Sequence, residues 1–346
     1  MGSLTFIGIG LNDSGKDLTV SGSSLIKNSD KVYLETYTTP GNKKIDLEIK
    51  KLNLKFYRIS RELIEDGKEI LEESKNKNIV LLVLGDSMIA TTHNDLRMRA
   101  IKCGIPTRII HNANIITSSF VETGLHTYKI GKIVTMTLDT FSSISTVYNT
   151  IHANLLLGLH TLILLEFNEE QNKGAKPNLV LETLLDSEND FKQNIINKKS
   201  FAIILSRIGR KNQRIIGEIL MNLMKKDVGD NPHAIIFPSK LHFTEQEALK
   251  TLNIYSKQTE GNRAKRLSEN MVKKYIPNTK RALELARNQI GTQHKFDQLF
   301  NNIECYISDS ERFYNEGKDE LAILSIGYAE GLLDALRMIG ELKIEW

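Results

Sequence analysis

The sequence predicts an α/β domain that extends to about residue 255, followed by an all-helical domain. Three observations support this prediction. The chain has 346 residues, more than one average domain contains. Short apolar runs typical of buried strands alternate with helix-length segments up to about residue 245. Beyond Tyr255 the strand-like runs end and only helical patterns follow.

The strands of the first domain are predicted from apolar runs. The clearest is IVLLVL at residues 79–84, which stops at Gly85-Asp86 as a central parallel strand does. Helix-length segments, such as residues 94–102 and 144–157, favour a mainly parallel sheet, whose ligands bind beyond the carboxyl ends of its strands. The other predicted strands are residues 4–9, 32–35, 108–111, 133–137, 162–167, 201–205 and 234–237.

The helical domain is predicted over residues 267–346, after a polar, glycine-containing linker at 256–266. Pro277-Asn278, Gly291 and Gly317 would divide it into three or four helices. In the last helix we expect a core stripe made of Leu321, Leu324, Tyr328, Leu332 and Leu336.

Charge is unevenly distributed over this domain. Residues 263–287 hold eight Lys or Arg against two Glu, whereas residues 295–346 hold five against eleven Asp or Glu. This favours oppositely charged helices packed side by side, and a basic face for RNA or another acidic partner is the alternative. The net charge of +4 is too small to indicate nucleic-acid binding by itself.

The sequence argues against several classes of protein and of binding site. A content of 40% hydrophobic and 25% charged residues argues against global disorder, and no apolar run approaches the ~18 residues of a membrane helix. The first ten residues lack the features of a secretory signal. Cys103 and Cys305 offer neither a disulfide framework nor a metal knuckle, so we expect a reducing cytoplasm and no metal.

Two phosphate-binding motifs begin in the N-terminal loop and then fail. The glycines at residues 8 and 10 start a dinucleotide fingerprint whose third glycine is replaced by Asp13. Residues 10–16 are close to a P-loop, but Asp17 stands where Ser or Thr should reach Mg²⁺. What remains is a glycine-bearing strand exit that lets a ligand approach the backbone closely.

A second loop, GDSMIATTH at residues 85–93, follows the most apolar run. Its Gly-Asp can aim a carboxylate and backbone amides into a crevice, and a turn that caps the next helix is the alternative. His93 is more typical of a helix-start or packing histidine than of an acid–base group. From the residues alone we therefore expect a small-molecule-binding α/β enzyme that relies on positioning, without a defined reaction.

The order of these motifs resembles the diphthine synthase family, in the tetrapyrrole-methylase-like group of S-adenosylmethionine (SAM)-dependent methyltransferases. The resemblance covers roughly residues 3–255. The strings that carry it are FIGIGLND (6–13), DLTVSG (17–22), DKVYLETYT (30–38), GDSMIATTHNDLRMRA (85–100), TGLHTYKIGK (123–132), GLHTLILLEF (158–167), LSRIG (205–209) and DVGDNPHAIIFPSKLHFTEQEAL (227–249).

The resemblance implies two α/β lobes, at about residues 1–112 and 113–255, with SAM in the cleft between them. The implied reaction is N-methylation, to the trimethylated amine, of a 3-amino-3-carboxypropyl histidine on translation elongation factor 2. This reaction belongs to diphthamide biosynthesis and leaves S-adenosylhomocysteine. The resemblance also implies an archaeal-type homodimer. The cytoplasmic location expected from the cysteines, and the absence of membrane and nucleic-acid partners expected from the apolar runs and the small net charge, are consistent with it.

Cofactor contacts can be carried over position by position. Ser87 replaces a proline of the family pattern, and Asn114 replaces a hydroxyl residue. Asp86, His93, Glu122 and His126 are candidates for accepting the proton of the amine, and none is singled out as the catalytic base. The implied cofactor contacts are Leu11, Asp86, Ile89, Asn114, Ile115, Leu165, Ile208 and His233.

Two other functions stay open at this point: a related SAM methyltransferase acting on rRNA or a corrinoid precursor, and a non-catalytic SAM sensor or scaffold. The C-terminal string AILSIGYAEGLLDALRMIG, at residues 322–340, resembles a small archaeal helical domain of unassigned function. Our hypothesis is that this domain aids docking to the elongation factor or the ribosome, or subunit assembly.

Overall fold

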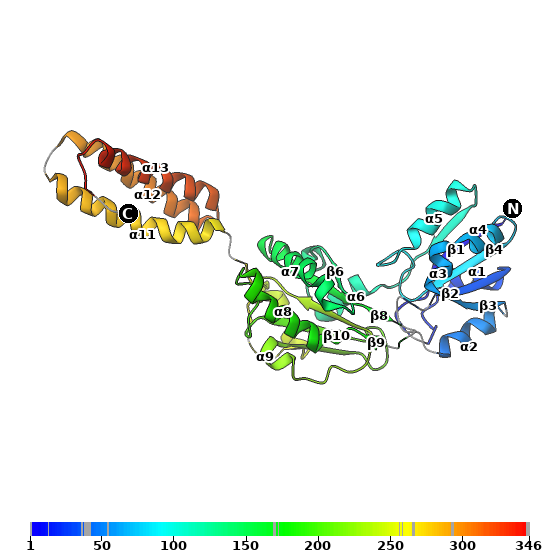
Figure 1. The fold of residues 1–346 in the computed structure, drawn as a ribbon. Helices are drawn as coiled ribbons and strands as arrows, with labels where there is room; N and C mark the ends of the chain where they lie inside the picture. The colour runs from blue at the N-terminus through cyan, green and yellow to red at the C-terminus, as the bar shows by residue number, and fades with distance from the viewer. Residues whose placement is uncertain are drawn as a thin grey trace. The chain divides into compact units, whose positions relative to one another are not determined.

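The computed structural model describes residues 2–12, 14–35, 37, 43–53, 55–168, 171, 173–255, 257, 259–264, 267–291 and 294–343. The chain divides into two compact units, Met1–Ala264 and Lys265–Trp346. The first unit contains two five-stranded sheets, and the second is built of helices (Figure 1).

The first sheet is entirely parallel, with the strand order β3-β2-β4-β1-β5. It confirms the predicted strands of this lobe and adds one that the sequence analysis missed, the short edge strand β3, whose two central residues are exposed. The five strands are β1 (Ser3–Gly8), β2 (Lys31–Glu35), β3 (Phe56–Ile59), β4 (Asn78–Val83) and β5 (Thr107–Ile110).

Strand β4 is apolar from Ile79 onward because helices cover both faces of this sheet. Ile79 and Leu81 belong to the core under α3, α4 and α5, whereas Val80 and Leu82 belong to the core under α1 and α2. Alternate residues of a strand point to opposite faces, so a strand with two buried faces needs an unbroken apolar run. The helices are α1 (Val20–Lys27), α2 (Lys43–Leu52), α3 (Arg61–Asp66), α4 (Lys68–Ser74) and α5 (His93–Lys102).

The second sheet is mixed, so the expectation of a mainly parallel sheet is wrong for this lobe. Its order is β11-β10-β12-β7-β6, and β6–β7 is its one parallel pair. An apolar run carries no information on strand direction, which depends on pairing with distant segments. The strands are β6 (Val134–Met136), β7 (Thr161–Leu165), β10 (Phe201–Ser206), the unpredicted edge strand β11 (Arg214–Ile219) and β12 (His233–Phe237).

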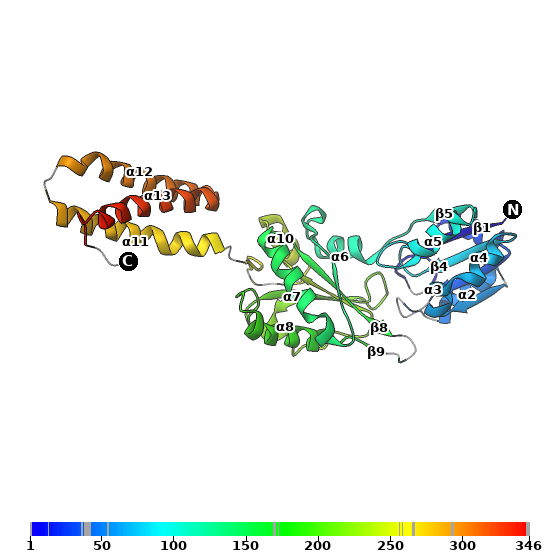
Figure 2. The ribbon, with the colours of Figure 1, turned by 45° about the horizontal axis from the view of Figure 1, so that its top comes forward.

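Helices cover both faces of the second sheet as well (Figure 2). The core on one face is shared with α7, α8 and α9, and the core on the other face with α6 and α10. A two-stranded ribbon, β8 (Phe167–Asn168) with β9 (Lys173–Gly174), follows β7. The helices are α6 (Ile115–Thr123), α7 (Thr140–Leu156), α8 (Pro177–Phe191), α9 (Leu220–Leu223) and α10 (Phe243–Thr251).

The second unit contains three long helices, α11 (Leu267–Ile290), α12 (Asp297–Asn315) and α13 (Asp319–Met338), around a core of its own. The predicted break at Pro277 is wrong, because α11 continues through it. A proline removes one backbone hydrogen bond, but Val272, Ile276 and Leu283 on either side are buried in the core and hold the helix in place. The breaks at Gly291 and Gly317 agree with the structure.

The predicted core stripe of α13 is largely wrong. Leu336 is buried and Leu332 partly buried, but Leu321, Leu324 and Tyr328 are exposed. The helix is apolar on two faces, and periodicity alone did not tell which of them packs inward. The buried face consists of Ala322, Ser325, Ile326, Ala329, Leu333 and Leu336.

Part of the predicted linker at 256–266 is held against the second lobe. Asn262 is buried, receives a hydrogen bond from the Phe201 backbone N–H and donates to the carbonyl oxygens of Phe201 and Pro238. Residues 256, 258, 265 and 266 lie outside the described residues. Over the part of the chain that the structure describes, no helix is both long and apolar enough to cross a membrane.

Candidate active site

A cavity of about 510 Å³ opens in the first unit where strands of both sheets end. Strand β12 runs antiparallel to β10 and β7, so its first residues lie beside the last residues of those strands, with His233 opposite Ser206. All eight residues implied by the family resemblance line this cavity: Leu11, Asp86, Ile89, Asn114, Ile115, Leu165, Ile208 and His233.

Glycines bring the exits of β1 and β4 together at the cavity wall. The Gly85 N–H donates to the Gly10 carbonyl oxygen at 2.8 Å, and the Gly10 N–H donates in return at 3.2 Å. A Cβ added to Gly8 would come within 2.5 Å of the Gly85 carbonyl oxygen, and Gly10 has a φ of +77°. The two strand exits can therefore lie against each other at this wall in a way that side chains would prevent.

The carboxylate of Asp86 is buried and fully engaged. One oxygen accepts the Met88 N–H at 2.9 Å, and the other accepts the Asn112 N–H at 3.1 Å and lies 2.9 Å from His111 Nδ1. These bonds tie the loop after β4 to the loop after β5. Asp86 thus shapes the cavity wall in addition to presenting a negative charge there.

Asn114 has a structural role that explains its departure from the family pattern. It is the N-cap of α6, where its side-chain oxygen accepts the N–H groups of Ile116 and Thr117. Asn, like Ser or Thr, is a favourable N-cap, so the substitution preserves the start of the helix.

His233 is held by its neighbours on both sides of the ring. Its Nδ1 lies 2.9 Å from Asn231 Oδ1, and its Nε2 lies 3.1 Å from the Gly229 carbonyl oxygen. These two contacts fix the orientation of the ring. Burial lowers the pKa of His233, although its hydrogen bond to Gly229 acts in the opposite direction.

The two lobes touch beside the cavity. A Cβ added to Gly209, which has a φ of +79°, would come within 2.5 Å of the Leu11 Cβ. The loop after β1 and the turn after β10 therefore pack closely, and Leu11 and Ile208 line the cavity from opposite lobes.

The four candidates for accepting the proton of the amine have different surroundings in the structure. His93 is completely buried, with Nδ1 3.0 Å from the Ser87 carbonyl oxygen and Nε2 3.3 Å from the hydroxyl of Tyr37, a residue of the cavity wall. Burial lowers the pKa of His93. Its route to the cavity is therefore indirect, through Tyr37.

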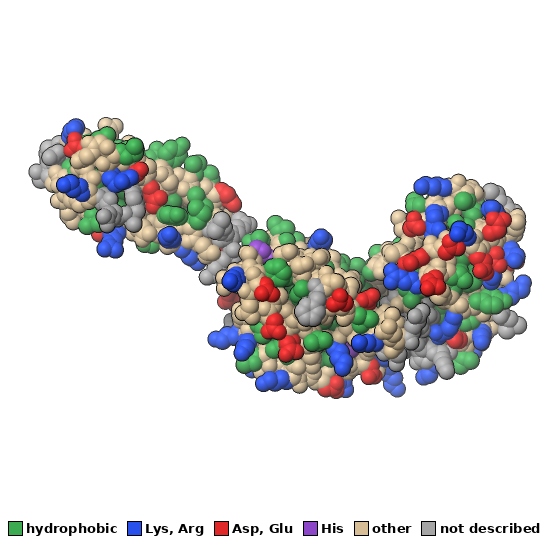
Figure 3. Space-filling view, viewed as in Figure 1, with side chains coloured by type: hydrophobic (Ala, Val, Ile, Leu, Met, Phe, Trp, Pro, Cys, Tyr) green, Lys and Arg blue, Asp and Glu red, His purple; other side chains and the backbone are tan. Residues whose placement is uncertain are grey.

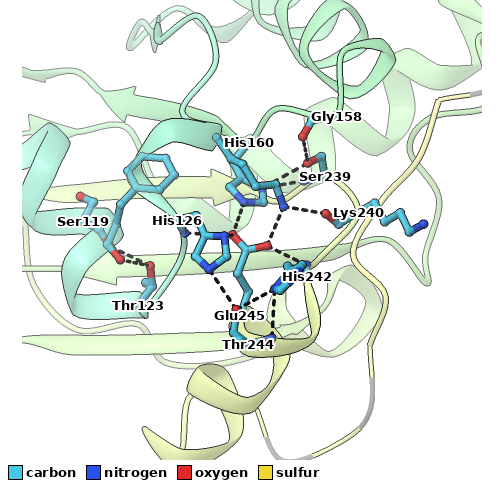
Figure 4. A network of polar contacts seen from close by, with 12 residues as sticks. Ser119, Thr123, His126, Gly158, His160, Ser239, Lys240, His242, Thr244 and Glu245 are labelled. Atoms are coloured by element: carbon cyan, nitrogen blue, oxygen red, sulfur yellow. Dashed lines mark hydrogen bonds and ion pairs between the residues drawn. The ribbon is translucent and has the colours of Figure 1, made fainter.

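Glu122 and His126 belong to other contacts. Glu122 accepts a hydrogen bond from Gln213 Nε2 at 2.9 Å. His126 belongs to a network around the buried carboxylate of Glu245, drawn in Figure 4. That carboxylate receives the Lys129 ammonium at 2.6 Å and lies 2.8 Å from His160 Nε2.

Four charged residues of the cavity wall escaped the sequence analysis: Arg61, Glu166, Arg207 and Arg210. Glu166 directly follows β7, and its carboxylate accepts the Leu138 N–H at 2.7 Å. Arg61 begins α3, and its pKa is raised first by its hydrogen bond to Glu65 and also by the charge of Glu166. Glu166 was missed because the sequence analysis placed it inside the predicted strand at 162–167. A carboxylate near the carboxyl end of a strand is nevertheless a signal of a binding site.

The residues present fit SAM. The cavity is within the size range of small-molecule sites, which are mostly apolar with a few fixed polar groups. Leu11, Ile89 and Ile208 offer apolar surface to an adenine ring, and Asp86, Asn114 and His233 place polar side chains in the same wall. The wall also carries charges of both signs, the carboxylates of Asp86 and Glu166 and the guanidinium groups of Arg61, Arg207 and Arg210.

Comparison with known proteins agrees with this geometry. Residues 3–221 match the family described as tetrapyrrole (corrin/porphyrin) methylases, and residues 246–342 match a family of unknown function, DUF357. A diphthine synthase of Methanocaldococcus jannaschii is 37% identical over 72% of this chain and 98% of its own. One of Methanosphaera stadtmanae is 36% identical over 72% and 95%.

A more distant relative and a solved structure point the same way. A diphthine methyl ester synthase of Dictyostelium discoideum is 33% identical over 72% of this chain and 98% of its own. A crystal structure of a diphthine synthase, 32% identical, superposes with a TM-score of 0.62 over 72% of this chain and 95% of that one. The chain therefore belongs to the tetrapyrrole methylases and, within them, to the diphthine synthases, which are SAM-dependent methyltransferases.

Proposed function

We propose that this chain trimethylates the amino group of a 3-amino-3-carboxypropyl histidine on translation elongation factor 2, as a step of diphthamide biosynthesis. The observation that supports the proposal most directly is the convergence of the eight family-implied residues on one cavity. SAM would be held by Leu11, Asp86, Ile89, Asn114, Ile115, Leu165, Ile208 and His233.

SAM supplies a methyl group on a sulfonium, which leaves as the neutral thioether of S-adenosylhomocysteine. The protein needs no nucleophile of its own for such a transfer. It must align the acceptor and exclude water, and such alignment lowers a barrier by about 7–11 kcal/mol. Rigid walls serve this purpose, and the bonds of Asp86 and the Asn114 cap supply them.

Glu166 is the group that we assign to the acceptor amine. An amine is protonated at neutral pH and must lose a proton before each methylation, so three transfers release three protons. The Glu166 carboxylate lines the cavity and keeps one oxygen bonded to the Leu138 N–H. It can therefore hold the ammonium group and accept its proton without moving.

Arg61 suits the carboxylate of the same acceptor. Its guanidinium lies at the cavity wall near Glu166, within 5.9 Å of the Tyr37 ring centroid. An arginine and a glutamate in one cavity wall match the carboxylate and the amine of an amino-acid group. The proposal includes a cytoplasmic location and a homodimer, both implied by the family resemblance.

The test uses the purified full chain, methyl-labelled SAM and elongation factor 2 that carries the unmethylated 3-amino-3-carboxypropyl histidine. We expect intact-mass spectrometry to show the mass of the trimethylated amine on that histidine peptide. Elongation factor 2 with an unmodified histidine is the control and should gain no label. If SAM binds but no label appears on either form, the acceptor is a different one, and labelled rRNA is the next substrate to try.

A further inference from the structure

The proposed trimethylation changes the chemistry of the acceptor that the cavity must hold. A primary ammonium carries N–H groups and binds a carboxylate through charge-assisted hydrogen bonds. After the last transfer the nitrogen keeps its positive charge, but methyl groups surround it and no N–H is left. A carboxylate such as Glu166 then loses its hydrogen bonds to the nitrogen, so the methylated cation needs a second kind of surface.

An aromatic ring is a surface that suits a quaternary ammonium, because its π-face attracts a cation without hydrogen bonds. Acidic and basic side chains are intermixed over the first lobe, so a carboxylate by itself does not distinguish the cavity (Figure 3). Among the wall residues that the structure describes, Tyr37 and Phe167 carry benzene-type rings. Phe167 is only 8% exposed, whereas Tyr37 is partly buried. Tyr37 therefore offers the ring that a ligand can reach.

Tyr37 follows the end of β2 and is held in place by His93. Its hydroxyl lies 3.3 Å from Nε2 of His93, a completely buried residue whose Nδ1 lies 3.0 Å from the Ser87 carbonyl oxygen. The two rings meet edge to face, with centroids 6.3 Å apart and planes at 68°. Burial, and then the charge of Glu35, raises the pKa of Tyr37 to about 12, so the phenol is neutral at physiological pH. The wall thus presents an uncharged π-face at a fixed position.

A cation already lies over this ring. The Cζ atom of Arg61 is 5.9 Å from the Tyr37 ring centroid, and both residues line the cavity. Nε of Arg61 donates to the Glu65 carboxylate at 2.6 Å. In the acceptor the amine and the carboxylate are attached to the same carbon. A carboxylate bound to Arg61 therefore brings the nitrogen to the side of the cavity where the Tyr37 ring lies.

We propose that the face of the Tyr37 ring holds the acceptor nitrogen once it carries methyl groups. Tyr37 is then a specificity-determining residue, because it favours the methylated cation and so sets how far methylation proceeds. His93 is a positioning residue, which acts through Tyr37. The inference deepens the proposed methylation and rests on it for the identity of the ligand, a quaternary ammonium with a carboxylate on the neighbouring carbon.

Two small mimics test the ring without any reaction. 2-Aminobutyrate has the amine and the carboxylate of the acceptor, and its N-trimethyl betaine has those of the product. In calorimetry on the full chain with S-adenosylhomocysteine, Tyr37→Leu should weaken betaine binding about tenfold, or about 1.4 kcal/mol, and binding of 2-aminobutyrate by at most about twofold. Tyr37→Phe keeps the π-face and should keep the preference for the betaine.

The control is Tyr57→Leu, at an exposed position on β3, which should bind both mimics as the wild type does. The absence of betaine binding to the wild type would overturn the proposal. An equal loss of both mimics in Tyr37→Leu would overturn it as well, because the ring would then not distinguish the methylated cation.

The products formed on elongation factor 2 supply a second test. Intact-mass spectrometry should show that Tyr37→Leu accumulates the monomethylated and dimethylated amines, with the third transfer slowed at least about tenfold relative to the first. A wild-type ratio of these rates in Tyr37→Leu would contradict the proposal. If the wild type transfers no methyl group, the proposed methylation fails, and betaine binding still decides the role of Tyr37.

Discussion

Two buried carboxylates, Asp86 and Glu245, occupy similar surroundings and differ in what they face. Both are almost inaccessible to solvent, and each is bonded to two backbone N–H groups and approached by a histidine. Asp86 lines the cavity. Glu245 instead binds the Lys129 ammonium and buried His160, and closes a network between α10, β7 and the turn after α6 (Figure 4).

The comparison shows that burial and perturbed ionisation do not by themselves mark a site. Burial alone would raise the pKa of Glu245, but hydrogen bonds from His160, Lys129 and two backbone N–H groups outweigh it and lower the pKa strongly. A strongly lowered pKa thus belongs here to a carboxylate with a structural role. Asp86 is the functional candidate because its contacts shape a cavity that a ligand can enter.

Removal of the Glu245 charge should give the largest effect. Glu245→Gln leaves the Lys129 ammonium and the His160 ring without their anion, and breaking such a buried pair costs about 3–5 kcal/mol. We expect that loss in the free energy of unfolding measured with urea. Glu247→Gln, an exposed residue on the same helix, should change it by less than about 0.5 kcal/mol. A stable Glu245→Gln variant that fails to bind SAM would reverse the assignment of the two carboxylates.

Glu166→Gln should affect the reaction and spare the fold. The glutamine oxygen can still accept the Leu138 N–H, but it cannot take a proton from the amine. We expect kcat to fall about a hundredfold, with the SAM dissociation constant unchanged in calorimetry. The pH profile of kcat should shift upward, since the amine must then deprotonate to solvent.

A matched control for this prediction is Glu182→Gln, an exposed position on α8. It should retain full activity. Loss of SAM affinity in Glu166→Gln, without loss of kcat at saturating SAM, would assign Glu166 to the cofactor instead of the acceptor.

Much of the first lobe and of its glycine-bearing exits could be predicted because the signals are local. A short, unbroken apolar run such as residues 79–84 indicates a strand that is buried on both faces. The pairing of β12 between β10 and β7 could not be predicted, since it joins segments far apart in sequence. In α13, apolar residues lie on two faces of the helix, so periodicity alone could not tell which face packs inward. The face that is buried in the structure contains the small residues Ala322 and Ala329.

Asp86→Ala should weaken SAM binding by at least tenfold, about 1.4 kcal/mol. The substitution removes a negative charge from the cavity wall and releases the Met88 and Asn112 N–H groups that it holds. Calorimetry on the folded variant measures the affinity. Asp95→Ala, an exposed carboxylate on α5, should bind as the wild type does. Wild-type affinity in Asp86→Ala would remove Asp86 from the cofactor site.

The stability of the protein should also depend on pH. Burial lowers the pKa values of His93, His160 and His233, so below about pH 6.5 the unfolded chain binds protons that the folded protein does not. The free energy of unfolding should therefore fall on acidification, by up to about 1.4 kcal/mol per pH unit for each histidine that stays neutral. The lowered pKa of Glu245 adds a further loss below about pH 4.5.

Urea titrations between about pH 7 and pH 5 isolate the histidine contribution, because Glu245 remains ionised there in both states. His160→Gln should reduce the slope of stability against pH, although it also lowers stability at neutral pH by removing a partner of Glu245. A slope that His160→Gln leaves intact would mean that His160 is protonated in the folded protein. The network would then resemble an ion-pair cluster of two cations on one carboxylate, and its contrast with Asp86 would be greater still.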